Sequence, residues 1–409
     1  MTMRISTNTM YEMGTSHLTT LQSQIARTQN QLSANRRILS GADDPIASAR
    51  ALEVTQSQAM NTQFVTNRNS AKSSLSLVDQ TLQSVTGRMQ DIQGLIVQAG
   101  NGAFTQSDRE SLATELEGRL NDLIGLANTR DGTGGYLFSG YKSNTQPFLQ
   151  TAEGAVYQGD QGQHTLQVGA SRKMATTENG STLFEGVATG NGSFEVQASG
   201  SNTGNGVVSQ GSVVNRAEFL GHDYTISFKT DSATQLTTYS VIDNSTTPTR
   251  DVITDAAFVA KTPIEFDGMS FDIEGAPKAG DSFSLESGAR QSVFTTVTDL
   301  IKTLRSPADG DAGKAALVNG LAAAGANMKN ALDNVLTVQA SVGARLKEVD
   351  NLDESGSALD VQYATTLSDL QDLDVVKAIS LFSQQQQTLQ AAQMSFKTMS
   401  GLSLFNYIS

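Results

Sequence analysis

The stretch AKSSLSLVDQTLQSVTGRMQDIQGLI, residues 71–96, carries the clearest structural signal in the chain. Its strongest apolar positions are separated alternately by four and three residues. Sustained over about four heptads, this pattern predicts a long helix that packs lengthwise against other helices. The residues of this seam are Ala71, Leu75, Val78, Leu82, Val85, Met89, Ile92 and Ile96.

A second stretch near the other end of the chain, from Leu317 to Val342, has the same alternation of four and three. No proline occurs between Pro45 and Pro147, or after Pro307. Since proline interrupts helices, both stretches can form long helices. We expect the second helix to run from residue 316 to residue 370, after a Gly/Asp-rich loop at 309–313.

A helix start is expected just after the first seam. The glycine-containing segment AGNGAF, residues 99–104, breaks the seam, and SDRE follows at 107–110. A serine followed three residues later by glutamate is a capping box, which places Ser107 at the N-cap and Glu110 at the third helical position.

The middle of the chain, residues 150–290, changes to a two-residue period. Tyr224, Ile226 and Phe228 alternate with polar residues, which is typical of strands. The segment 264–273 has two such runs around an Asp-Gly pair, which predicts a hairpin. The fold class is therefore mainly α with an inserted β domain, which we expect to be an all-β sandwich or barrel-like domain.

Both chain ends also carry apolar residues with a seven-residue repeat. On an isolated helix such a narrow stripe buries too little surface to offset the cost of ordering the chain. The ends are therefore expected to be mobile in a single chain and to fold when neighbouring copies supply the other half of the seam. We assign their apolar residues to an assembly interface. These residues are Leu18, Leu21, Ile25, Leu32 and Leu39, and Val375, Ile379, Phe382, Leu389, Phe396 and Met399.

The expected domain order is close to palindromic, with coaxial terminal helices, a rod of long helices and an outer β domain. The terminal helical coiled-coil domain and its joints comprise 1–47 and 372–409, the long-helix rod with a small β-hairpin region comprises 48–149 and 291–371, and the β-rich outer domain is 150–290.

The segment RRILSGADDP, residues 36–45, contains two adjacent carboxylates beside a proline. Proline is favoured at the first position of a helix, so Asp44 is the natural N-cap ahead of Pro45, and both Asp43 and Asp44 face the positive end of the helix dipole. Gly41 supplies flexibility just before them. A catalytic dyad would need a concave pocket, which a joint between two helices does not offer. We therefore assign these four residues to a helix cap and joint.

Composition excludes several other classes of function. The net charge is −13, which argues against nucleic-acid binding. There is no cysteine, so disulfides and thiol chemistry are absent. The three histidines are scattered without metal-ligand spacing, and no apolar run is long enough to cross a membrane. We expect no catalytic, cofactor-binding or metal site, and hence no enzyme.

The chain ends resemble a known family. MRISTNTMYE (3–12), LQSQIARTQNQLSANRRILSGADDPIASA (21–49) and ISLFSQQQQTLQAAQMSFKTMSGLSLFNYIS (379–409) are similar to the termini of the bacterial flagellin family. The resemblance covers about residues 3–150 and 290–409. It implies that segments 3–40 and 375–404 form an inner coiled-coil domain. It further implies export of the unfolded chain through the flagellar type III apparatus, with signals near the N-terminus and a dedicated chaperone on the C-terminal segment.

Three details within the family are similar to subunits at the junction of hook and filament. They are the MRIST start, the stretch GYLFSGYKSNTQPF (135–148) and the ending SGLSLFNYIS (400–409). The resemblance implies a secreted structural subunit of the bacterial flagellum that connects hook to filament through a ring of its own copies. Its other partners would be another hook-associated protein and flagellin.

Two alternatives remain open at this point. The chain could be a flagellin, the bulk filament subunit. In a different class, the β insertion could be a carbohydrate-binding or hydrolytic module on a helical stalk, with Asp267, Asp272, Glu274 and Asp281 as site residues. A membrane-acting effector from a related secretion system is disfavoured, because the apolar helix pair that it would need is absent.

Overall fold

The computed structural model describes residues 7–132, 134–231, 234 and 236–401. Residues 3–6 and 402–404 of the expected inner domain lie outside the described residues, as does the start of the chain where the export signals are expected. The chain divides into two compact units. The terminal unit comprises the two chain ends, up to residue 66 and from residue 352, and the central unit comprises 67–351. The two units therefore divide at residues 66/67 and 351/352, inside two long helices. The expected domain boundaries, at 47/48 and 371/372, lie near the joints.

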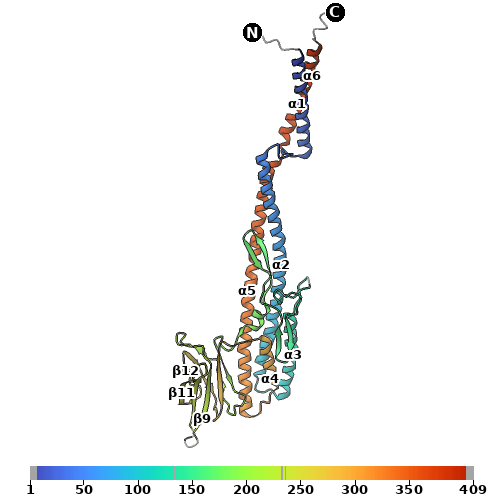
Figure 1. Ribbon diagram of the computed structural model, residues 1–409. Helices are drawn as coiled ribbons and strands as arrows, with labels where there is room; N and C mark the ends of the chain where they lie inside the picture. Colours follow the sequence, from blue (N-terminus) through green and yellow to red (C-terminus); the bar gives the residue numbers. More distant parts are fainter. Residues whose placement is uncertain (1–6, 133, 232–233, 235, 402–409) are drawn as a thin grey trace, which may run out of the picture. The chain divides into compact units, whose positions relative to one another are not determined.

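The described part of the chain contains six α-helices (Figure 1). They are α1 (Thr7–Ala34), α2 (Pro45–Ala99), α3 (Gln106–Ala127), α4 (Val293–Arg305), α5 (Gly310–Gln371) and α6 (Val375–Gly401). The two predicted seams lie in α2 and α5, which contain 55 and 62 residues. The loop expected at 309–313 is wrong, because α5 already begins at Gly310, where a left-handed φ of 66° lets the chain turn into the helix.

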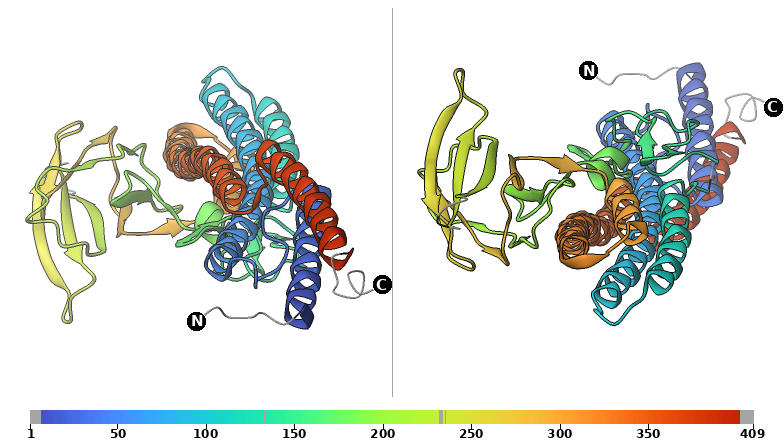
Figure 2. Two further views of the ribbon diagram at one scale, coloured as in Figure 1. Left: turned by 90° about the horizontal axis from the view of Figure 1, so that it is seen from above. Right: turned by 90° about the horizontal axis from the view of Figure 1, so that it is seen from below.

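Burial confirms the lengthwise packing predicted from the first seam. All of its residues from Ala71 to Ile92 are fully buried in the central unit. Polar contacts also join α2 to α5: the Lys72 Nζ lies 2.7 Å from the Asp350 Oδ1, and the Gln339 side chain donates to the Asp79 carboxylate at 3.2 Å. Figure 2 shows the helices of this unit side by side, with the strand-rich part against one side, next to α5.

The start of α3 differs from the expected capping box. The N-cap is Thr105, whose hydroxyl accepts a hydrogen bond from the backbone N–H of Asp108, while the Asp108 carboxylate accepts from the Thr105 N–H at 2.8 Å. The predicted box at Ser107 and Glu110 is therefore wrong by two residues. The same pattern occurs earlier as Thr-Gln-Ser-Asp, and the short aspartate side chain accepts from both the backbone N–H and the hydroxyl of the cap residue.

Two antiparallel sheets form the predicted β sandwich. The larger has the order β11-β10-β9-β15-β6, and the smaller has the order β12-β13-β8. The strands of the larger sheet are β6 (Phe194–Ala198), β9 (Tyr224–Thr230), β10 (Thr237–Asp243), β11 (Arg250–Ala257) and β15 (Ser282–Ser287). Those of the smaller sheet are β8 (Ser212–Val213), β12 (Ile264–Phe266) and β13 (Met269–Phe271).

Shorter strand pairs form separate two-stranded sheets. They are β1 (Phe148–Thr151) with β2 (Gly154–Tyr157), β3 (Thr165–Gly169) with β4 (Arg172–Ala175), β5 (Val187–Ala188) with β16 (Arg290–Gln291), and β7 (Val207–Val208) with β14 (Ile273–Glu274). A single π-helical turn, Ser181–Glu185, precedes β5.

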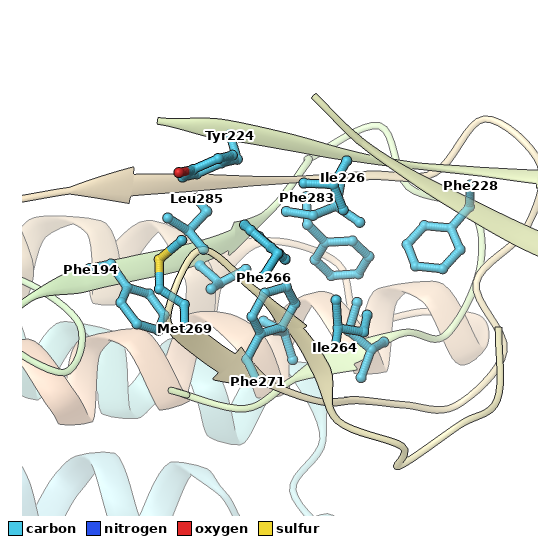
Figure 3. Close-up of a cluster of buried hydrophobic side chains, with 14 residues drawn as sticks. Phe194, Tyr224, Ile226, Phe228, Ile264, Phe266, Met269, Phe271, Phe283 and Leu285 are labelled. Carbon is cyan, nitrogen blue, oxygen red and sulfur yellow. The ribbon is translucent and has the colours of Figure 1, made fainter. Parts of the chain in front are cut away.

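Apolar side chains from both sheets fill the sandwich (Figure 3). Tyr224, Ile226 and Phe228 project from β9 into this core, as their alternation predicted. The predicted hairpin is confirmed, since β12 pairs with β13. Its turn residues Asp267 and Gly268 have φ values of 43° and 75°, as a tight hairpin turn requires.

The first two hairpins of the β-rich region contact helices. The β1–β2 hairpin contacts α3 and α4, and the β3–β4 hairpin packs against the long helices α2 and α5. The buried Arg68 of α2 donates to the Val168 carbonyl at 3.0 Å, and Arg172 pairs with Glu348 of α5 at 2.6 Å. Arg345 of α5 donates to the Ala175 carbonyl at 3.0 Å. Within the expected domain 150–290, the sandwich itself therefore extends from β6 to β15, and the earlier hairpins contact the helical rod.

Truncating the seam tests this packing. Leu82→Ala should lower the free energy of unfolding by about 2–5 kcal/mol, because it removes a fully buried side chain and leaves a cavity. Val97→Ala on the same helix, where the side chain is 79% exposed, should change it by less than about 0.5 kcal/mol. Urea unfolding followed by circular dichroism measures both; equal effects would contradict the packing.

Candidate assembly surface and helix joint

In the terminal unit, α1 and α6 lie side by side and run in opposite directions (Figure 1). The Tyr11 and Phe396 rings have centroids 5.1 Å apart, and the Thr28 hydroxyl donates to the Gln385 side chain at 3.0 Å. A Cβ on Gly14 would lie 2.6 Å from the Phe396 ring, so a side chain there would force the helices apart. The first and last helices of one chain therefore close a seam with each other.

The predicted interface residues fall into two groups. The first group is partly buried and lies along the α1–α6 seam: Leu18, Leu21, Ile25, Leu32, Phe382, Leu389 and Phe396. The second group is exposed: Leu39, Val375, Ile379 and Met399. Much of the heptad stripe therefore faces the other end of the same chain, and only part of it is open to a neighbour.

Other apolar side chains are more exposed than these. Met13, Val376 and Met394 are 60%, 77% and 68% exposed. Val376 and Met394 are 18 residues apart, which is five full helical turns, so they lie on one face of α6. The heptad pattern does not select them, because they lie outside the repeat. The sequence could have indicated them only as apolar residues at helix positions that face away from a two-helix seam.

The joint between α1 and α2 is tied to the chain segment just before α6. Asn35 ends α1 with a left-handed φ of 50°. The Arg37 N–H donates to the Gln371 carbonyl at 2.8 Å, and the Arg37 guanidinium donates to the Leu370 carbonyl at 2.7 Å. A backbone bridge between Arg36 and Asp372 adds to this connection. Both chain segments thus bend at the same place.

Asp43 organises the loop of the joint. Its Oδ2 accepts from the backbone N–H groups of Leu39 at 3.0 Å and Ser40 at 2.9 Å, and its Oδ1 lies 2.8 Å from the Arg27 guanidinium. These backbone hydrogen bonds, first that from Ser40, hold the pKa of the Asp43 carboxyl below its ordinary value.

Asp44 stands at the start of α2, whose first residue is Pro45. The Asp44 Oδ1 accepts from the Ala47 N–H at 3.0 Å, which is N-cap geometry, and the Arg37 guanidinium lies 3.2 Å from its Oδ2. The Ala47 hydrogen bond is the largest cause that lowers the pKa of Asp44. The two carboxylates therefore have structural partners of their own rather than forming a shared acid–base pair.

The start of α6 repeats this arrangement. The Asp374 carboxylate accepts from the Lys377 N–H at 3.1 Å, and this bond lowers the pKa of Asp374. Gly41 lies between these elements and is exposed; a Cβ there would meet nothing within 4 Å. Both helices that leave the joint thus begin with a capping aspartate, and Gly41 itself is not in a position that only glycine can occupy.

Asp281 and Asp267, two of the four acids considered for a site in the β domain, have structural partners. Asp281 accepts from the backbone N–H groups of Thr203 at 2.8 Å and Lys278 at 2.8 Å. Asp267 accepts from the Tyr224 hydroxyl at 2.8 Å. Within the part of the chain that the structure describes, no three His, Asp or Glu side chains are arranged to hold a metal ion. None of the described helices is long and apolar enough to span a membrane.

Paired terminal helices, long central helices and an inserted β domain define a flagellin-type subunit, and residues 5–143 match the bacterial flagellin N-terminal helical region. Flagellar hook-associated protein 3 of Salmonella typhimurium is 32% identical over 98% of this chain and 99% of its own length. Its Escherichia coli counterpart is 30% identical with the same coverage. The chain belongs to the family of flagellar hook-associated protein 3.

The solved structures agree. The crystal structure of hook-associated protein 3 from Legionella pneumophila matches with a TM-score of 0.74 and 32% identity, covering 78% of this chain and 98% of that one. Similarity to flagellins is more limited. A Serratia marcescens flagellin is 30% identical over only 32% of this chain and 37% of its own length. The flagellin alternative is therefore the weaker one.

The joint carboxylates predict a pH response. Because their pKa values are lowered in the folded protein, the stability that they contribute is present above the ordinary value of about 3.9 and is lost as the pH falls through the lowered values. Hydrogen exchange of residues 36–50, corrected for intrinsic rates, should be constant from about pH 7 to pH 5 and rise below about pH 4. Asp44→Asn should keep the cap and weaken this response, whereas Asp44→Ala should raise exchange at every pH. Identical profiles for all three proteins would contradict the assignment.

Proposed function

We propose that this protein is the structural subunit that connects hook to filament in the bacterial flagellum, where its copies form a ring through their terminal helices. The observation that carries the proposal is the set of apolar side chains left exposed on α1 and α6, although these two helices already share a closed seam. Full-length similarity to hook-associated protein 3 supports the flagellar setting.

The exposed side chains supply the driving force. Burying one valine or methionine side chain completely is worth roughly 1.5–3 kcal/mol. Three such side chains, Met13, Val376 and Met394, lie on the helices of the terminal unit and are mostly in water. Head-to-tail contact with a different surface of the next copy would bury them repeatedly around a ring. The exposed heptad residues Leu39, Val375, Ile379 and Met399 would extend this surface.

The partners follow from the family rather than from the geometry. The ring would contact another hook-associated protein on the hook side and flagellin on the filament side. Before assembly the chain would be exported through the flagellar apparatus, with a chaperone on its C-terminal segment. The named relatives are structural flagellar proteins, which supports a role without catalysis.

The joint would provide the mechanical adjustment between two unlike structures. Its loop is held by Asp43 and Arg37, whereas Gly41 is exposed and uncrowded. We propose that small changes of backbone angle near Gly41 let the terminal helices follow both a curved hook and a straighter filament while the two capping aspartates keep the helix ends fixed.

Location tests the function directly. Immunogold labelling of isolated flagella with an antibody against residues 150–290 should give a single band where hook meets filament. A ring of few subunits cannot label a long filament. Label along the whole filament would instead make the protein a flagellin, and flagella without label would contradict both.

A triple variant tests the exposed surface. Met13→Ser, Val376→Ser and Met394→Ser together should reduce the amount of the protein in purified hook–filament preparations at least about tenfold, since tenfold corresponds to only about 1.4 kcal/mol of lost contact. Immunoblotting of the preparations measures the amount, and the amount exported into the medium serves to normalise it.

The matched control removes three exposed apolar side chains from the central unit: Leu149→Ser, Val156→Ser and Val214→Ser. This control should assemble as the natural protein does. Equal loss in the two triple variants would show that general surface hydrophobicity, rather than the terminal helices, drives assembly.

A further inference from the structure

A cleft of about 380 Å³ lies in the central unit between strand β6 and the helices α4 and α5. Its α5 side includes Asn319, Asn327 and four small residues: Ala316, Gly320, Ala323 and Ala324. Because the alanine and glycine positions of α5 that line the cleft have small side chains, the strand and the helix leave space between them. At Gly320 the helices α4 and α5 touch, since a Cβ there would lie 2.5 Å from the Thr303 side chain. The volume is within the range of ligand sites.

The cleft is anionic. Its lining contains Glu195 and Asp299, and no lysine or arginine occurs among the described residues that line it. Asp299 lies partly in solvent and is held by Gln291 at 2.9 Å and Lys302 at 3.1 Å. Glu195 is different, because only 4% of it is exposed. The cleft thus combines a neutralised acid near solvent with a second acid that is buried.

The charge of Glu195 is poorly compensated. Within the described chain its carboxylate accepts one side-chain hydrogen bond, from the Asn327 amide at 3.3 Å. That amide also donates to Gln291 at 3.3 Å, and the Asn327 Oδ1 accepts from the Gly190 N–H at 2.8 Å. A carboxylate has room for about four hydrogen bonds, and a buried one is costly without a cation. Glu195 therefore faces the cleft as an acceptor that a cationic group would satisfy.

The strand beside the cleft has a free edge. β6 is at the end of its sheet and pairs with β15. The Ser199 N–H donates to the Ser282 carbonyl at 3.0 Å, so the odd-numbered residues of β6 face β15. The backbone groups of Val196 and Ala198, which line the cleft, then point to the other side. An unpaired strand edge is a template for an extended segment of another chain.

We propose that this cleft binds an extended peptide segment of a partner protein, which pairs with the free edge of β6 and places an arginine or lysine side chain against Glu195. The strand edge accounts for a peptide rather than a free cation, and the buried carboxylate accounts for the basic side chain. The inference is independent of the junction role, because it uses no residue of the terminal unit.

Binding of two peptides to the full-length protein tests the proposal. The probes are dye-labelled Thr-Val-Arg-Val-Thr and its twin with citrulline, which has the shape of arginine without the charge. Fluorescence anisotropy should show at least about tenfold tighter binding of the arginine peptide, as expected for a charge-assisted hydrogen bond. Glu195→Gln should abolish this preference. Glu286→Gln is the matched control, because Glu286 lies opposite Glu195 on β15 but is exposed, and it should leave the preference intact.

A second variant keeps the test decisive if Glu195→Gln fails to fold. Ala323→Leu fills the cleft from the α5 side and should abolish binding of both peptides while the circular dichroism spectrum stays unchanged. The proposal is overturned if neither peptide binds at millimolar concentration, if Glu195→Gln keeps the preference, or if Ala323→Leu binds both normally. Argininamide binding as tightly as the arginine peptide would overturn the strand-pairing part.

Discussion

The seam between α1 and α6 is the contact on which the rest of the terminal unit depends. It joins the first and last helices of the chain through the Tyr11–Phe396 ring contact, the close approach at Gly14 and the Thr28–Gln385 hydrogen bond. Once both ends are held together, every other element is an insertion between them. The chain must leave through α2 and return through α5. The long apolar repeats of α2 and α5 allow each of them to run as one continuous helix.

The charged residues of the joint stabilise the bend that both chain segments make between the terminal helices and the long helices. A chain that bends sharply leaves backbone N–H groups without partners, and these must be satisfied by other acceptors. Asp43, Asp44 and Asp374 accept those hydrogen bonds, and Arg37 holds the carbonyls of the other segment. The paired carboxylates of the sequence are therefore explained by backbone geometry. This also explains why they resemble an acid–base dyad in the sequence and not in the structure.

Periodicity predicted the parts of the fold in which one physical rule dominates. The seam 71–96 was recognisable because long-helix packing imposes the heptad repeat, and the hairpin at 264–271 because Asp-Gly satisfies two left-handed positions. The start of α3 was predicted two residues too late because two overlapping capping patterns compete within six residues. For the candidate surface, the heptads of α1 and α6 identified apolar seams but not whether the partner is the same chain or a neighbour, since both bury the same residues. The burial of Glu195 could not be predicted from the sequence, because a charged residue within a strand normally faces solvent.

We propose that the α1–α6 seam closes within each chain and that neighbouring copies meet on other faces of these helices. The most direct measurement uses Thr28→Cys with Gln385→Cys in this otherwise cysteine-free chain. Assembled flagella carrying the variant are oxidised and analysed by electrophoresis without reductant. The account predicts a disulfide within one chain, seen as a monomer of altered mobility. Disulfide-linked dimers and higher species would mean that the seam is exchanged between copies, and would contradict it.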